Sequence, residues 1–164
     1  KGLDYRDVDN DDVDEALERV HRWDKNKGGE SVPELRNEIQ ELMQASFGVF
    51  RKADLMADGL KKLQDMKARL EKASIEDHSS AFNTARIEAL ELDNLLEVAL
   101  ATAAAANWRK ESRGAHSRVD FPKRDDEHYL KHSIYTDGCD EMKTREVNMT
   151  TRYVKPVKVQ ERVS

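Results

Sequence analysis

The residues best suited to chemistry in this sequence lie in one polar stretch, 109–126. Five cationic side chains stand close together there: Arg109, Arg113, His116, Arg118 and Arg124. Carboxylates are interleaved with them: Glu111, Asp120, Asp125 and Asp126. Planar guanidinium groups pair with carboxylates through two parallel hydrogen bonds, so the stretch suits a clamp between two surfaces. Solvated ion pairs would leave the same pattern.

We predict that this stretch is an interface with another domain. Its expected members are Arg113, Gly114, His116, Arg118 and Arg124. Gly114 belongs to the set because a residue without a Cβ lets the backbone of a partner approach closely.

Other features of the sequence favour structural roles. His128 and His132 stand four residues apart, which on a helix would place two imidazoles on one face, but two further convincing metal ligands are missing. Cys139 reads as an exposed loop thiol, since no serine or cysteine nucleophile system is recognisable. The sequence has no Gly-x-Gly-x-x-Gly fingerprint for a dinucleotide. We therefore predict no catalytic, cofactor-binding or metal-binding residue in this chain.

Composition limits the class of protein. Charged residues make up 37% of the chain and aromatic residues 6%, a balance typical of long charged helices and unlike a β-sandwich. The net charge of −5 predicts no nucleic-acid partner, and the basic segment 143–162 lacks the aromatic interleaving of a single-strand binder. The lone Cys139 fits a reducing compartment. No apolar run approaches the roughly 18 residues of a membrane span, so we expect the chain by itself to be soluble.

The element that positions the polar stretch is a helix predicted over 83–108, just ahead of it. Apolar residues form two overlapping stripes at three- and four-residue steps along this segment, which predicts a central helix buried on most sides. The alanine-rich run 101–106 would let neighbouring backbones approach closely, although low complexity alone would give such a run. The apolar residues are Ile87, Leu90, Leu92, Leu95, Leu96, Val98, Ala99, Leu100, Ala103 and Ala106.

Three further helices are predicted ahead of the central one, over 11–24, 31–50 and 55–72. Ser31 and Glu34 stand at the spacing of a capping box, which predicts the start of the second helix.

Single residues within these segments carry three more expectations. Gly59 inside the third helix predicts close helix packing, and Phe82 is expected to plug the end of the bundle. Asn94 on the central helix is either a structural register device or an interface group, and the structural role is favoured.

After residue 110 the helical pattern ends. We predict a short helical turn at 125–131 and strand-like runs over 130–135, 146–149 and 153–159. A tail of this length cannot bury itself, so it is either disordered or packed on a surface, and its apolar residues favour packing.

The predicted fold is therefore mainly α. Residues 1–110 form an antiparallel helical bundle of three long helices and a shorter N-terminal helix. Residues 111–164 form the polar loop and an irregular tail with short strand-like pieces, which packs on the bundle or on an absent domain.

The polar stretch 111–126 closely resembles the carboxy-terminal domain of the succinate dehydrogenase flavoprotein subunit family. It reads Glu-Ser-Arg-Gly-Ala-His-Ser-Arg-Val-Asp-Phe-Pro-Lys-Arg-Asp-Asp. Four further segments match that family at similar spacings and extend the resemblance over much of the chain: 82–84, 90–95, 131–133 and 144–149. The tail resembles that of succinate dehydrogenases more than that of the other members of the family. Its motif Arg-Glu-Val-Asn-Met resembles bacterial sequences.

The resemblance implies a parent enzyme with covalent FAD that oxidises succinate to fumarate. Electrons would pass to an iron-sulfur subunit and then to quinone, with membrane anchor subunits in the same complex. The flavin-binding and capping domains would precede this segment, which itself would hold no cofactor and no catalytic residue. The parent would lie peripherally at the cytoplasmic face of the bacterial inner membrane, and this segment would be its detached helical domain.

Alternatives remain at the level of the sequence. Fumarate reductase flavoproteins and L-aspartate oxidases share the helical domain and a similar Ser-Arg-Gly loop. An autonomous helical-bundle interaction module would also show long amphipathic helices, but it would not need the polar loop or the strand-like tail.

Overall fold

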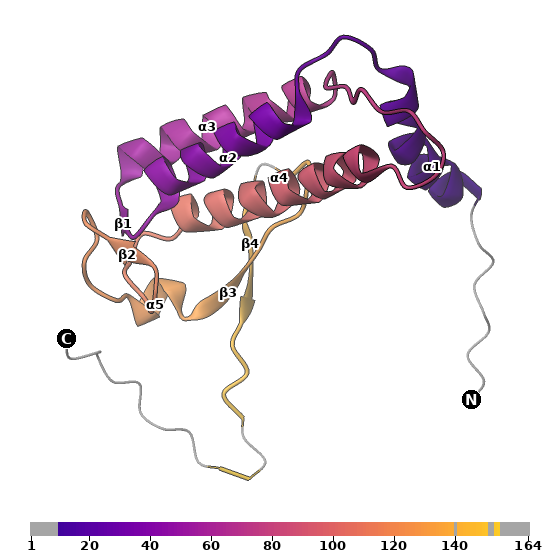
Figure 1. Ribbon diagram of the computed structural model, residues 1–164. Helices are drawn as coiled ribbons and strands as arrows, with labels where there is room; N and C mark the ends of the chain where they lie inside the picture. Colours follow the sequence, from indigo (N-terminus) through magenta and orange to yellow (C-terminus); the bar gives the residue numbers. More distant parts are fainter. Residues whose placement is uncertain (1–9, 140, 151–152, 155–164) are drawn as a thin grey trace, which may run out of the picture.

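Three long helices packed side by side form the body of the structure (Figure 1). They are α2 (Val32–Phe47), α3 (Ala53–Leu70) and α4 (Thr84–Trp108), and successive helices run antiparallel. Because α2 contacts both α3 and α4, the three helices enclose one core. This computed structural model describes residues 10–139, 141–150 and 153–154. The predicted mainly α bundle is confirmed.

Apolar side chains at helical spacing fill this core. Each large apolar side chain that leaves water contributes about 1.5–3 kcal/mol, so burial dominates the stabilisation of the bundle. The buried residues of the three helices include Leu35, Ile39, Phe47, Met56, Leu63, Met66, Leu92, Leu96, Ala99, Leu100 and Ala103.

Gly59 marks a close contact between α2 and α3. A Cβ at Gly59 would lie 2.5 Å from the Cβ of Ser46 and 2.9 Å from the Cε2 atom of Phe47. Any larger residue would force the two helices apart. The prediction of close packing at Gly59 is confirmed.

Helix α1 (Asn10–Lys25) lies at one end of the bundle, opposite β1 and β2 (Figure 1). Trp23 is fully buried and joins the core. The guanidinium group of Arg19 donates to the side-chain oxygen of Asn94 on α4 at 2.6 Å. This contact links α1 to α4. The other apolar residues of α1 stay at least partly exposed: Val13, Leu17 and Val20.

Helices α2 and α4 begin where the sequence predicts, but the predicted cap of α2 is absent. Ser31 is the residue before α2, but its side chain caps no backbone N–H, so the predicted capping box is wrong. Asn83 caps α4 instead, because its Oδ1 accepts from the backbone N–H of Arg86 at 2.7 Å. Phe82 does not plug the bundle. Its side chain is fully exposed and its φ is 54°, since the turn into Asn83 directs it outward.

Two short sheets accompany the long helices, and β1 lies in the connection between α2 and α3. β1 (Phe50–Arg51) pairs in parallel with β2 (Ser117–Arg118), and β3 (Lys131–Ile134) pairs antiparallel with β4 (Lys143–Glu146). A single helical turn, α5 (Asp126–Tyr129), precedes β3.

One helix boundary and two predicted strands differ from the prediction. The second helix ends at Phe47, and Phe50, expected on its apolar face, belongs to β1 and is 76% exposed. The strand expected over 146–149 is wrong, because the pairing with β3 ends at Glu146. The strand expected over 153–159 lies largely outside the described residues, and residues 153–154 form a bend.

Helix α4 is buried on most sides, as its two apolar stripes predict, and it contacts α1, α2 and α3. One narrow line of residues stays in solvent, in which Ile87 is 57% exposed and Val98 is 64% exposed. None of the helices within the described residues combines the length and apolarity that crossing a membrane requires.

Candidate functional site

The polar stretch after α4 docks on the connection between α2 and α3. We call residues 109–126 the arginine loop. Its strand β2 pairs with β1, and the backbone N–H of Val119 donates to the carbonyl of Arg51 at 2.9 Å. The carboxylate of Asp120 accepts from the backbone N–H of Ala53 at 3.1 Å, in the first turn of α3. A carboxylate suits this place because the N-terminus of a helix carries partial positive charge.

Glu111 is the centre of the loop. Its side chain is 0% exposed, and it accepts hydrogen bonds from the guanidinium groups of Arg109 and Arg113 and from the backbone N–H of Asp125. Burial opposes ionisation, but the donors outweigh it, so the pKa of Glu111 lies below its ordinary value. Arg109 also donates to the carbonyl of Tyr129 at 2.7 Å, which ties the end of α4 to the tail.

Arg118 is the second buried charge, at 1% exposure. Its Nε and Nη2 atoms each lie 2.7 Å from an oxygen of Asp120, which makes a two-pronged ion pair. Its Nη1 donates to the carbonyl of Arg109 at 3.1 Å. The hydrogen bonds from Arg118 lower the pKa of Asp120 to about 2. Asp120 therefore stays ionised over most of the accessible pH range.

His116 joins the loop to β1 in a defined protonation state. Its Nδ1 lies 2.7 Å from Nη1 of Arg51, and its Nε2 lies 3.1 Å from the carbonyl oxygen of Arg109. Since a guanidinium can only donate and a carbonyl can only accept, the imidazole is neutral with its proton on Nε2. Burial, followed by the positive charges of Arg51, Arg118 and Arg109, lowers the pKa of His116.

The tip of the arginine loop is a tight hairpin. The backbones of Arg113 and His116 exchange hydrogen bonds of 2.8 and 3.0 Å, and Gly114 lies between them at φ 58°. Gly114 has open space around the position of a Cβ, so it makes no close approach within this chain. Arg113 also reaches Asp126 at 2.7 Å, and Arg124 lies 2.9 Å from the other oxygen of the same carboxylate.

The predicted members of the interface thus lie together, but carboxylates of this chain already pair with their guanidinium groups. Exposed apolar side chains lie around the loop instead. Val49 lies just before β1, Phe50 lies within β1, and Val119 and Phe121 follow β2. Such a cluster beside a rigid polar loop is a surface that can pack against another protein surface.

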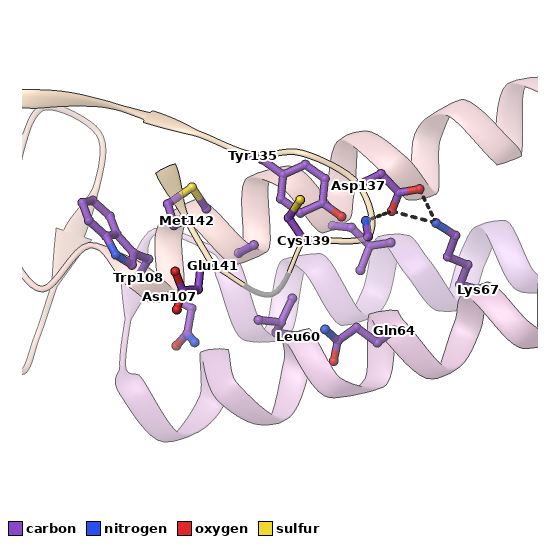
Figure 2. Close-up of a pocket in the computed structure, with 13 residues that line it drawn as sticks. Leu60, Gln64, Lys67, Asn107, Trp108, Tyr135, Asp137, Cys139, Glu141 and Met142 are labelled. Atoms are coloured by element: carbon purple, nitrogen blue, oxygen red, sulfur yellow. Dashed lines mark hydrogen bonds and ion pairs between the residues drawn. The ribbon is translucent and has the colours of Figure 1, made fainter. Parts of the chain in front are cut away.

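A second feature is a hollow of about 500 Å³ between α3, α4 and the β3–β4 connection (Figure 2). Leu60, Trp108 and Tyr135 line it. Its rim holds Lys67, which pairs with Asp137 at 2.9 Å and with Glu97 at 2.7 Å, and Glu141 lines it as well.

The structure does not bring the remaining candidate residues, Cys139, His128 and His132, together in one site. Cys139 is an exposed thiol, as predicted. His128 lies on α5 and His132 on β3, so they do not share a helix face. Among the described residues, no group of three histidine, cysteine or acidic side chains is placed to hold a metal ion.

Sequence reasoning missed Arg51, which supports His116 from 65 positions earlier in the chain. It noted Asp120 only as an interleaved carboxylate, whereas Asp120 serves both Arg118 and the start of α3. The only signal for Arg51 was its place at the predicted break between two helices.

Comparison with known proteins identifies the family of this fold and loop. The family model for the C-terminal part of fumarate reductase flavoproteins matches residues 36–163. The chain belongs to this family. The resemblance seen in the sequence is thereby confirmed, and the family is one of flavoprotein oxidoreductases that carry the names succinate dehydrogenase and fumarate reductase.

Relatives of both names match this member of the family. A succinate dehydrogenase flavoprotein subunit of Coxiella burnetii is 47% identical over 155 residues, covering 94% of this chain and 26% of that protein. A fumarate reductase flavoprotein subunit of Mycobacterium tuberculosis is 39% identical over 108 residues, covering 66% of this chain and 18% of that protein. The structure of E. coli quinol fumarate reductase matches with a TM-score of 0.82 at 31% identity, covering 96% of this chain and 27% of that one. This chain therefore spans at most 27% of the length of these relatives.

Proposed function

We propose that this chain is the C-terminal structural domain of a succinate dehydrogenase flavoprotein subunit. The observation that carries the proposal is the 47% identity, over 94% of the chain, to a protein of that name. The parent protein would oxidise succinate to fumarate with covalent FAD and pass electrons to an iron-sulfur subunit and quinone. Its complex would include membrane anchor subunits at the cytoplasmic face of the bacterial inner membrane.

The described residues do not fit a flavin site of their own. The buried guanidinium of Arg118 is paired with Asp120, and the buried carboxylate of Glu111 is paired with two arginines. These two charges are thus used within the arginine loop, and the sequence lacks a glycine-rich phosphate loop. The domain would therefore be non-catalytic and would support the preceding flavin-binding and capping domains.

The arginine loop would form part of the interface with those domains. Arg113, His116 and Arg118 would act by holding the loop rigid, because their partners lie within this chain. The loop would then present Gly114 and the apolar residues beside it. Arg124 would belong to the same interface, since it shares Asp126 with Arg113.

Purification of the full-length protein and an assay of dye reduction test the proposed activity. We expect succinate to reduce the dye and the flavin to remain attached after acid precipitation. Oxidation of aspartate without oxidation of succinate would contradict the proposal and indicate an L-aspartate oxidase. Fumarate reductase is the second candidate, since a relative of that name matches, and a rate of fumarate reduction far above that of succinate oxidation would favour it.

The role of the loop is tested by Arg113→Ala in the full-length protein. We expect a lower flavin content and a lower melting temperature, because Glu111 and Asp126 lose a shared donor. Arg36→Ala on α2 is the matched control, since Arg36 lies outside the loop and makes only surface contacts. Unchanged flavin content and unchanged melting temperature in Arg113→Ala would rule out this role.

A further inference from the structure

The hollow between α3, α4 and the β3–β4 connection contains polar side chains that bind nothing in the described part of the chain. Gln64 of α3, Asn107 of α4 and Glu141 of the connection all line it (Figure 2). None of the three side chains makes a hydrogen bond or an ion pair with another described residue. Three elements thus offer unused acceptors to one volume of about 500 Å³, which lies within the usual range of ligand sites, about 300–1,000 Å³.

Ion pairs and hydrogen bonds hold the walls of the hollow in place. The ammonium group of Lys67 on α3 lies 2.7 Å from Glu97 on α4 and 2.9 Å from Asp137 in the connection, so one side chain joins all three elements. At the start of β3, Arg109 donates to the carbonyl of Lys131 at 2.9 Å. The hollow is therefore already formed without a ligand, which lowers the entropic cost of binding one.

The charges around the hollow favour a cation. Asp137 and Glu97 share the single ammonium group of Lys67, and Glu141 adds a third carboxylate. A cation that enters the hollow would gain an ion pair, whereas an anion would be repelled.

Aromatic rings form part of the apolar wall. Trp108 and Tyr135 line the hollow and are only partly buried, so they keep surface for a ligand. Trp108 is fixed by edge-to-face packing on Tyr129, with ring centres 5.1 Å apart. The faces of such rings attract cations. Arg109 takes one such position, 5.8 Å from the centre of the Trp108 ring, and Glu111 balances its charge.

We propose that this hollow binds a small organic cation, an amine with an aromatic or aliphatic body. An ammonium group has three N–H donors and no acceptor. The carboxylate of Glu141 and the side-chain oxygens of Gln64 and Asn107 would accept from it, while the apolar body would lie against Trp108 and Tyr135. The site does not depend on the proposed function, since every group that lines it belongs to this chain.

Protection of a native thiol tests the site, because Cys139 is exposed and lines the hollow. The full-length protein is treated with methyl methanethiosulfonate, with and without millimolar phenethylamine, and the modified Cys139 peptide is quantified by mass spectrometry. Phenylethanol and phenylacetate are the neutral and anionic controls of similar size. We expect phenethylamine to slow the modification about fivefold at saturation, since a bound ligand fills most of its pocket. Neither control should slow it.

Glu141→Gln tests the ion pair. This substitution removes the charge of an exposed side chain, so the fold is preserved. We expect the concentration of phenethylamine that half-protects Cys139 to rise about fivefold, the effect of losing one partly exposed ion pair. Glu34→Gln is the matched control and should leave that concentration unchanged, since Glu34 is exposed on α2 and lies outside the hollow.

Three results would overturn the proposal. Equal protection by all three probes would reject selection for a cation, and no protection by phenethylamine would reject the binding site. The same half-protecting concentration with and without Glu141→Gln would reject the role of Glu141. A thiol at Cys139 that reacts only after denaturation would also reject the site, since another part of the protein would then cover the hollow.

Discussion

At the scale of single residues, the site depends on two buried charges that are matched within the chain. Glu111 is enclosed by two guanidinium groups and a backbone N–H, and Arg118 is enclosed by Asp120, a carbonyl and the ring of Phe121. A buried charge is tolerated only with such partners. Both buried charges are consequently held in place by partners from the same chain.

Glu111→Gln should destabilise the fold by about 3 kcal/mol, because removing one member of a buried ion network leaves the others unpaired. The measurement is the free energy of unfolding from urea titration. Glu18→Gln, which alters an exposed carboxylate paired with Lys25, should cause no measurable change. Equal effects of the two substitutions would contradict the central place given to Glu111.

His116 should make stability depend on pH below 6.5. Because burial lowers the pKa of His116 from 6.5 in the folded state, the unfolded chain binds a proton first as the pH falls. Its contribution is therefore complete above pH 6.5 and declines as the pH falls through 6.5 towards the folded pKa. His116→Gln, which keeps a donor and an acceptor but does not titrate, should flatten this part of the stability curve. His78→Gln, at an exposed position, should leave the curve unchanged.

The sequence revealed the cationic residues of the loop but not their partners. Five cations interleaved with carboxylates are visible without a structure, and they do come together. The sequence could not show that Arg51 supports His116, because that contact forms only when β1 and β2 pair. It also could not show that Glu111 is buried, since a charged residue in a polar stretch is expected to be exposed to solvent.

At the scale of elements, the periodicity of apolar residues located every long helix. The residues expected to cap the helices were a less reliable guide to their ends. Ser31 had the expected sequence for a capping box, yet its side chain makes no cap hydrogen bond. Asn83 makes three hydrogen bonds and sits directly before the helix that positions the loop. Sequence spacing alone did not distinguish the side chain that caps its helix, Asn83, from the one that does not, Ser31. Whether a side chain reaches the backbone N–H groups of the first turn depends on the path of the preceding turn.

Asn83→Ala should therefore cost about 1–2 kcal/mol of unfolding free energy, the usual range for loss of a helix N-cap. Ser31→Ala should cost only a few tenths, since no cap bond is lost there. Thermal unfolding of the two variants under the same conditions makes the comparison. A larger loss for Ser31→Ala than for Asn83→Ala would contradict the assignment of the two caps.

At the scale of the whole molecule, the two apolar stripes of α4 correctly predicted a central helix that is covered on most sides. Ile87 and Val98 remain in solvent on its one exposed side. The sequence could not show which apolar positions stay exposed, because the periodicity of a helix does not say which neighbour covers each position. The family match, with coverage of 26% of one relative's length, supports a longer protein that contains this chain.

The most direct test of the account is the flavin content of the full-length protein with and without this 164-residue segment. If the segment is a non-catalytic support, its deletion should abolish or strongly reduce bound flavin and succinate oxidation together, because the flavin-binding part loses the surface that packs on it. A shortened protein that retained full flavin content, thermal stability and succinate turnover would contradict the account.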